Sequence, residues 1–428
     1  MIIDVHTHIF NCRFLPIDGI LKIWFRLVGI PDEVAEAVAA IINAGTDDCS
    51  GRPLSKVQGQ IDTRFTDLED RDALIEILWQ QTPPETFAAL PVLRAWTRFA
   101  VGGKGKKVAK AKFFALFYEA VRGRPVDLFE TPEEFLKWLI LMTRCEARIF
   151  RILRRAYPAA TLFVHHMMDM DNYYPGSSHY PFVTDQLSRI RDLVTANASR
   201  LLAFVAFDPK REEWNEILNA ALDAGYTGVK FYPPNGYRPS EDPDPVVRDR
   251  TRKFFSWCVG RHVPIFTHCT PHGFEAYKGS GLLSDPVNWR PVLRANPSLK
   301  VCFAHAGGTA FWFGHTEDEG YAYGERVVEL CRRYPNVYCE VGYLDEILTP
   351  DGPRQFRATL EAILAAPGNE RLADRIMYGT DWHMIFRLSD HKRYLAAFGE
   401  AFDSPILRRI RDRFFSGNAI RYLGLSPS

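Results

Sequence analysis

The sequence predicts an α/β protein with a (β/α)8 TIM barrel and a large helical insertion after the first strand. From about residue 160 onward, short apolar segments alternate with helical patterns, which is typical of a parallel sheet covered by helices on both faces. A further apolar segment opens the chain, so the expected strands number eight, as a barrel of this kind requires. Residues 11–159 between them carry apolar side chains at helical spacings of three and four.

The predicted barrel comprises residues 1–10 and 160–428. Its strands after the first are expected at TLFVHHMMDM, RLLAFVAFDP, TGVKFYPP, VPIFTHCTP, LKVCFAHAGG, NVYCEVGYL and RIMYGTDWHM. DQLSRIRDLVTANA, EEWNEILNAALDAG and RDRTRKFFSWCVG predict helices between them. An open doubly wound sheet is the alternative, but it would carry a glycine-rich phosphate-binding turn after an early strand, and no such turn is found.

The insertion over residues 11–159 is expected to hold four or five helices. One is predicted at residues 31–45, which open with Pro31 and end at Gly45, the positions these residue types favour. Residues 131–155 predict one long helix, with Thr131 and Glu134 in a capping box. Further helices are predicted at residues 71–80, 85–100 and 111–122.

Composition points to a small-molecule partner. A net charge of +1 over 428 residues gives no field that would attract nucleic acid or an anionic membrane, and no apolar run approaches the length of a membrane span. The opening residues lack the basic region and long apolar core of a signal peptide. Eight scattered cysteines without a Cys-x-x-Cys pair predict reduced, buried thiols, so we expect a cytoplasmic protein; a homodimer is left open.

Polar residues gather where the predicted strands end. In order they are His6 and His8, His165 and His166, Asp208, Lys230, His268, His305, Glu340 and Asp381. Each alone has a structural explanation: a histidine can bond a nearby carbonyl, and Asp381 could cap the next helix. A closed barrel, however, brings these strand ends around one mouth, where imidazoles and carboxylates are the ligand set for Zn²⁺ and similar ions.

The motifs DVHTH, FTHC, FAHAGG and GTDWH resemble, in that order, those of the amidohydrolase superfamily. The sequence is most similar to the branch that contains aminocarboxymuconate-semialdehyde and resorcylate decarboxylases, and the C-terminal FFSGNAIRYLGL resembles that branch's closing helix. The resemblance covers residues 1–9 and about 160–428.

This resemblance implies a divalent metal, expected to be Zn²⁺, held by His6, His8, His268 and Asp381. His305 would stand just outside these ligands as the general acid/base, and Asp381 would also orient the nucleophilic water. One ion is expected, and two are an open alternative.

Lys230 leaves several roles open. The string GVKFYPPN resembles the strand-four lysine segment of dihydroorotase-like members, where a carboxylated lysine bridges two metals and His268 and His305 bind the second ion. Lys230 could instead contact a substrate carboxylate, or form an ion pair with Glu340 or Asp381.

Further residues near these motifs are candidates for substrate binding, each with packing or capping as the alternative. They are His166, Tyr232, Arg238, His272 and His383.

The resulting prediction is a metal-dependent hydrolase that uses metal-activated water on a small organic amide, ester or lactone bearing a carboxylate. Non-oxidative decarboxylation of an aromatic or muconate-type acid is the alternative reaction, and a non-catalytic, metal-stabilised binding protein is the alternative class. Because the insertion leaves the barrel beside the expected metal, we expect its helices to form a lid or wall over the pocket. Packing on the barrel's flank or a dimer contact is the alternative.

Overall fold

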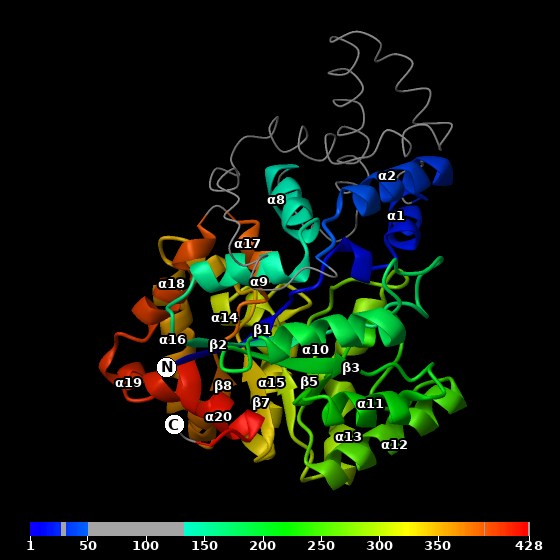
Figure 1. Ribbon diagram of the computed structural model, residues 1–428. Coiled ribbons are helices and arrows are strands. Elements are labelled where there is room, and N and C mark those ends of the chain that lie inside the picture. Colours follow the sequence, from blue (N-terminus) through cyan, green and yellow to red (C-terminus); the bar gives the residue numbers. More distant parts are fainter. Residues whose placement is uncertain (27–30, 50–131, 389, 427–428) are drawn as a thin grey trace, which may run out of the picture. The chain divides into compact units, whose positions relative to one another are not determined.

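Eight parallel strands pair in chain order in the computed structural model, which describes residues 1–26, 31–49, 132–388 and 390–426 (Figure 1). The strands are β1 (Ile2–Thr7), β2 (Thr161–His166), β3 (Leu201–Ala206), β4 (Gly228–Phe231), β5 (Ile265–Thr267), β6 (Val301–Phe303), β7 (Val337–Glu340) and β8 (Ile376–Met377). Backbone hydrogen bonds from Val5 N to Tyr378 O (3.2 Å) and from Asp381 N to His6 O (2.8 Å) join the last strand to the first. The predicted (β/α)8 barrel is therefore confirmed.

The chain divides into two compact units. The first contains the barrel and comprises Met1–His8, Leu153–Asp169 and Leu187–Ser428; the second comprises Ile9–Ile152 and Met170–Gln186. The helices predicted at residues 71–80, 85–100 and 111–122, and Thr131 of the predicted capping box, lie outside the described residues. The domain boundaries at residues 10 and 160 and the role of the insertion as a lid stay predictions.

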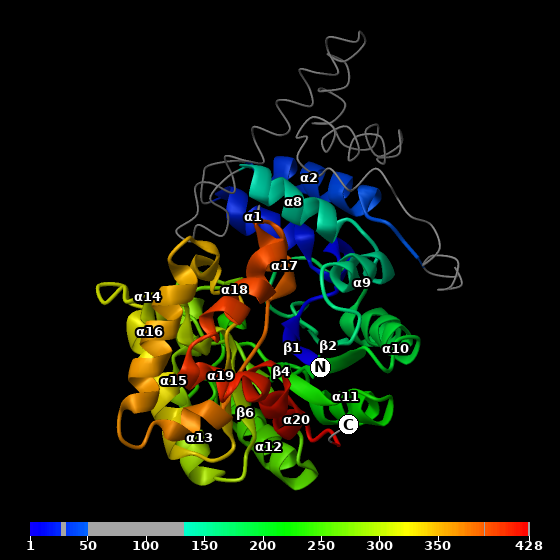
Figure 2. The same cartoon turned by 90° about the vertical axis from the view of Figure 1, so that its left-hand side faces the viewer.

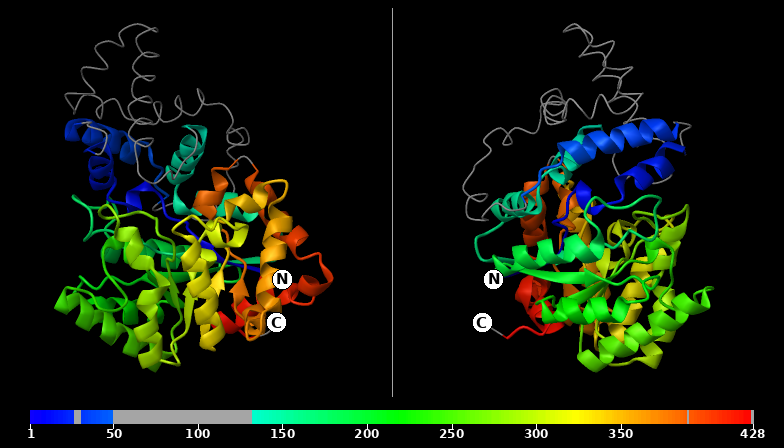
Figure 3. Two further views of the ribbon diagram at one scale, coloured as in Figure 1. Left: turned by 180° about the vertical axis from the view of Figure 1, so that it is seen from behind. Right: turned by 45° about the vertical axis from the view of Figure 1, so that its right-hand side comes forward.

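Helices lie outside the strands of the barrel unit (Figures 1 and 3). The main ones are α10 (Leu187–Thr195), α11 (Trp214–Asp223), α12 (Pro245–Arg261), α13 (Trp289–Ala295), α15 (Tyr321–Arg333), α16 (Gly352–Ala365), α18 (Tyr394–Ala401) and α20 (Asn418–Leu423). Helix α12 shows how local sequence sets a boundary: the side chain of Asp244 accepts hydrogen bonds from the backbone N–H groups of Val246 and Val247, and Pro245 fits the first turn.

The barrel interior is apolar away from the strand ends. Ile3, Phe204, Phe266 and Met377 belong to one buried cluster, to which α20 contributes Tyr422. Helix α20 lies in the segment FFSGNAIRYLGL, so the closing helix expected there is confirmed. The barrel thus has a packed apolar core, and its buried polar groups gather at the carboxyl ends of the strands, where barrels of this kind place their active sites.

The second unit holds α1 (Ile17–Arg26), α2 (Asp32–Gly45) and α8 (Pro132–Met142), and α9 (Glu146–Arg155) begins in it. Helices α1 and α2 pack against each other (Figure 2). The helix predicted at residues 31–45 is confirmed as α2, with Pro31 directly before its first turn.

The single helix predicted over residues 131–155 is wrong, because α8 and α9 are separated by a turn at Thr143–Cys145. The carbonyl of Thr143 accepts a hydrogen bond from Asp47 N (2.9 Å) instead of continuing the helical pattern, and Arg144 turns to the Asp47 carboxylate (3.4 Å). A contact 96 residues distant in sequence therefore overrides local helix propensity.

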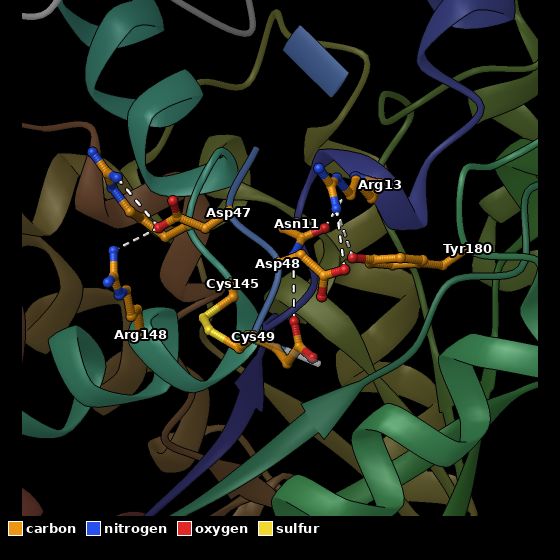
Figure 4. The surroundings of a disulfide bond; sticks show 10 residues. Asn11, Arg13, Asp47, Asp48, Cys49, Cys145, Arg148 and Tyr180 are labelled. Carbon is orange, nitrogen blue, oxygen red and sulfur yellow. Dashed lines mark hydrogen bonds and ion pairs between the residues drawn. A yellow bond between two sulfur atoms is a disulfide. The ribbon is translucent and has the colours of Figure 1, made fainter. Parts of the chain in front are cut away.

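The prediction that all cysteines are reduced is also wrong, because Cys49 and Cys145 form a disulfide. Figure 4 shows Asp47 and Arg148 on one side of this bond and Arg13, Asp48 and Tyr180 on the other. The two cysteines are 96 residues apart, so no local sequence pattern predicts that they pair. The remaining six cysteines are free and buried, as expected. The cytoplasmic location stays a prediction.

Among the described residues, no helix combines the length and the apolar character that a bilayer span requires.

Candidate metal centre

Strand β1 delivers two imidazoles to one carboxylate. His6 lies in β1 and His8 directly follows it, and Asp381 Oδ1 is 3.8 Å from His6 Nε2 and 3.5 Å from His8 Nε2. Asp381 has a left-handed backbone (φ 51°) and precedes α17 (Trp382–Phe386), yet its side chain does not cap that helix. Helix capping is therefore excluded as the reason for an aspartate at this position.

His268 and His305 approach from the next strand ends. His268 follows β5, and His305 follows β6 in a turn where its own backbone is left-handed (φ 58°). Their facing ring nitrogens, His268 Nδ1 and His305 Nε2, are 3.3 Å apart. One ligand atom each from His6, His305 and Asp381 lies within 4.8 Å of the other two. His305 is thus as central as the four residues expected to bind the metal.

The imidazoles of His6, His8, His268 and His305 each donate a hydrogen bond from one ring nitrogen. The second ring nitrogen of each faces Asp381 or another of these imidazoles. The distances are 2.7 Å from His6 Nδ1 to Glu340 Oε1, 2.9 Å from His8 Nδ1 to the His166 carbonyl, 2.6 Å from His268 Nε2 to the His272 carbonyl, and 2.9 Å from His305 Nδ1 to the Gly342 carbonyl. A carbonyl oxygen only accepts, so the facing nitrogen carries the hydrogen and the other nitrogen of a neutral ring carries a lone pair. Histidines that bind metals are held in this way.

These lone pairs fit a divalent cation. His268 Nδ1 and His305 Nε2 would face each other as two acceptors at 3.3 Å, an arrangement that a cation or a proton relieves. His6 Nε2 is buried, and no hydrogen-bond partner for it is found in the described part of the chain. Imidazole nitrogens with one carboxylate form a ligand set typical of Zn²⁺ and related ions, so the residues fit the metal that the motifs imply.

Burial sets the protonation of the group. It lowers the pKa of His6, His8, His268 and His305, which keeps the rings neutral and able to bind a cation. It also raises the pKa of Asp381 to about 7, against the opposing effect of Lys230.

Lys230 is the buried cation of this region. Burial lowers its pKa to about 8, and the carboxylates of Asp381 and Glu340 oppose that shift. Its Nζ lies 4.7 Å from the ring centroid of Phe266 and 5.8 Å from that of Tyr232. The ammonium is therefore held among aromatic faces and carboxylates, and its predicted roles stay open.

Two of the candidate substrate-binding residues lie beside the group, and both are buried. The His166 ring stacks on Phe266 with centroids 3.9 Å apart, and its Nε2 is 2.8 Å from the Val5 carbonyl. The His383 ring centroid is 6.2 Å from that of His8.

Tyr232 also reaches the centre, with its ring centroid 5.0 Å from that of His268. Its hydroxyl accepts a hydrogen bond from Phe274 N (2.8 Å), which holds the loop after β5.

The structure does not bring the remaining two candidates to the centre through their side chains. Arg238 is exposed, and within the described ranges no hydrogen bond or ion pair joins its guanidinium to the imidazoles; its backbone N donates to Asp242. His272 is exposed and contributes its carbonyl, rather than its imidazole, as the acceptor for His268.

Two buried acids, Asp4 and Glu340, position the imidazole group, and the sequence alone did not predict this role. Asp4 accepts hydrogen bonds from His6 N (3.1 Å), Thr380 N (3.1 Å) and Thr380 Oγ1 (2.7 Å), and so fastens β1 to the turn that carries Asp381. Glu340, expected only as a strand-end acid and an alternative ion-pair partner of Lys230, contacts His6 directly. An acid inside an otherwise apolar strand is the signal that could have identified both.

Comparisons with known proteins agree with this architecture. The sequence profile of the amidohydrolase family matches residues 154–425, which is more than half of the chain. No curated protein matches the chain significantly.

Similar solved structures include an amidohydrolase from Burkholderia multivorans with bound zinc (13% identity, 68% of this chain and 92% of that one, TM-score 0.46). Others are a probable 2-pyrone-4,6-dicarboxylic acid hydrolase from Acinetobacter baumannii (13%, 65% and 88%, 0.45) and a 5-carboxyvanillate decarboxylase from Novosphingobium aromaticivorans with bound manganese (15%, 62% and 76%, 0.43). At these values neither the reaction nor the metal of those proteins carries over to this chain.

The family profile covers the strands that bring His268, His305 and Asp381 together, and the family implies a divalent metal of the kind this residue set fits. The chain belongs to the amidohydrolase family and is an enzyme of that type.

Proposed function

We propose that this protein is a metal-dependent hydrolase that cleaves a small amide, ester or lactone bearing a carboxylate. The observation that carries the proposal is the arrangement of the four imidazoles, each with one nitrogen held by an acceptor and the other turned toward the group around Asp381. A purely structural histidine cluster would leave facing lone pairs unsatisfied in a buried place, which is costly.

His6, His8, His268 and Asp381 would hold the ion, and His305 is close enough to join them. When bound, a divalent metal supplies Lewis acidity, which polarises the scissile carbonyl and makes water more acidic. Zn²⁺ is the ion we propose first, because neutral imidazoles dominate the ligand set.

Proton transfer falls to Asp381 and His305. The carboxylate of Asp381 faces the imidazoles of His6 and His8 and can orient the attacking water and accept its proton. His305, whose Nδ1 is fixed by the Gly342 carbonyl, presents Nε2 for a proton on the way to the leaving group.

Lys230 is proposed to bind the substrate's carboxylate. It is a buried cation beside aromatic rings, and an incoming carboxylate would offset the cost of burying its charge. A carboxylate-bearing substrate is therefore favoured over a neutral one.

The proposal is tested by metal content and turnover in the same preparations. Wild type is expected to bind about one equivalent of a divalent metal, measured by elemental analysis after zinc loading, and to hydrolyse members of a panel of carboxylate-bearing lactones, esters and amides. His6→Ala should lose both properties. His315→Ala, which removes an exposed imidazole paired with Glu346, is the matched control and should keep both.

Protein without stoichiometric metal after zinc loading, together with a fully active His6→Ala variant, would sink the metalloenzyme proposal. Release of CO₂ from aromatic or muconate-type acids, without hydrolysis of any panel member, would replace hydrolysis with the alternative of non-oxidative decarboxylation.

A further inference from the structure

Glu340 at the end of β7 is a fully buried carboxylate that faces three donors. Its Oε1 is 2.7 Å from His6 Nδ1 and accepts a hydrogen bond from His305 N (2.8 Å), while its Oε2 accepts one from Gly342 N (2.5 Å). One side chain therefore contacts the ring of a proposed metal ligand, the backbone of the proposed acid/base, and the turn whose carbonyl orients that second ring.

Two neighbouring glycines leave room for this carboxylate. A Cβ at Gly379 would lie 2.1 Å from Glu340 Oε2, and a Cβ at Gly342 would lie 2.8 Å from the same oxygen and 2.8 Å from His6 Nδ1. Contacts this short do not occur for real side chains, so both positions require glycine as long as Glu340 stays where it is. The glycine of the GTD motif is thus explained by an acid on the neighbouring strand.

The hydrogen-bond pattern fixes the tautomer of His6. Both oxygens of the ionised Glu340 carboxylate can only accept, and Oε1 also accepts the N–H of His305, so the neutral His6 ring must supply the hydrogen from Nδ1. The lone pair of His6 is then on Nε2, the atom that faces Asp381 at 3.8 Å. Without this acceptor the proton could move to Nε2, and the ring could not bind a cation through that atom.

We propose that Glu340 is a positioning residue that locks His6 in the metal-binding tautomer and simultaneously holds the His305 turn. This inference deepens the proposed function and rests on it. The carboxylate acts through His6 and His305 and does not itself touch the substrate.

The variant Glu340→Gln tests the inference, because an amide cannot accept at both ends. Whichever way the amide is oriented, its NH₂ group meets either Gly342 N–H or the donors of His6 and His305. Zinc affinity of the full chain, measured by competition with a chelator, is expected to fall ~10- to 100-fold. Glu340→Asp keeps the charge but shortens the side chain, and should restore part of the loss.

The matched control is Glu346→Gln. Glu346 also pairs with an imidazole (His315, 2.7 Å), but at the surface, so its zinc affinity should equal that of wild type. A merely structural role for Glu340 would lower the thermal midpoint without moving the tautomer, so the second readout is the ¹⁵N spectrum of histidine-labelled protein. A protonated Nδ1 of His6, assigned by its absence in His6→Gln, should be present in metal-free wild type and lost in metal-free Glu340→Ala, which offers no acceptor at that atom.

Zinc affinity of folded Glu340→Gln within twofold of wild type, or an unchanged His6 Nδ1–H signal in Glu340→Ala, would overturn the inference. Should the glutamine variant fail to fold, zinc affinity is measured on Glu340→Ala and judged by the same criterion. Should wild type itself bind no zinc, the proposed metal function fails, while the Nδ1–H signal in the metal-free chain still tests the tautomer lock.

Discussion

The imidazole group of the barrel unit is buried, and the disulfide junction of the second unit is partly buried. Both are polar, but their polar atoms are satisfied in different ways. At the junction, Asp47 faces Arg144 and Arg148, and a covalent bond closes the contact. Around Asp381, each imidazole is fixed at one nitrogen and keeps acceptor capacity at the other. The contrast separates polar residues that serve stability from those arranged for a ligand, and the two regions should respond differently to substitution.

The largest effect is expected at the imidazole group. His6→Ala and Asp381→Asn should each lower kcat/KM by ~10³-fold or more, because a metal contributes several kcal/mol to the transition state. Far-UV circular dichroism would verify that each variant keeps the secondary structure of wild type. Retained turnover in both folded variants would show that these residues are structural after all.

Removing the disulfide should lower the free energy of unfolding and leave metal binding unchanged. Cys49→Ser removes a cross-link between residues 96 apart, and the chain-entropy relation gives a loss of about 4 to 5 kcal/mol in the free energy of unfolding. Urea titrations would measure the loss, while zinc content should be unaffected. Adding a reductant should destabilise wild type and leave the variant unchanged; equal midpoints for wild type under both conditions would speak against the cross-link.

Gly379→Ala should affect both properties at once. The new Cβ meets Glu340 Oε2, so we expect a loss of about 1 to 3 kcal/mol in unfolding free energy together with weaker zinc binding. Gly260→Ala, in α12 with open space around its Cα, is the control and should be neutral or slightly stabilising. An alanine variant as stable as wild type would mean that the carboxylate moves aside freely.

The smallest of these effects is expected at the charges beside the disulfide. Asp47→Asn should cost about 2 kcal/mol, because it removes a charged hydrogen-bond acceptor from the buried Arg144 and the partly buried Arg148. Asp192→Asn breaks an exposed pair with Arg191 and should cost under ~0.5 kcal/mol. Thermal unfolding of the two variants side by side measures the difference, and equal losses would contradict it.

The contrast also explains what could be predicted from the sequence. Apolar strands and their polar ends follow a local period, so the eight-stranded barrel and the convergence of His6, His8 and Asp381 could be predicted without coordinates. The Cys49–Cys145 bond and the helix break at Thr143 depend on contacts made 96 residues away, which no local pattern encodes.

The roles of individual atoms at the imidazole group also could not be predicted from the sequence. That His272 contributes its carbonyl instead of its ring depends on the path of a loop, and that Glu340 contacts His6 depends on the register of β7 with β8. Residue types at strand ends identify a group of candidates, whereas hydrogen-bond geometry decides which nitrogen of each ring faces the others.

The seam between β1 and β8 has a kinetic consequence. Asp4 and Thr380, whose hydrogen bonds fasten this seam, are 376 residues apart, so their contact closes a loop that contains most of the chain. Contacts of such high contact order carry a large loop-closure entropy and form late in folding. His6 and Asp381 meet across the same seam, so if these residues hold the proposed metal, its uptake during refolding would report the final closure of the barrel.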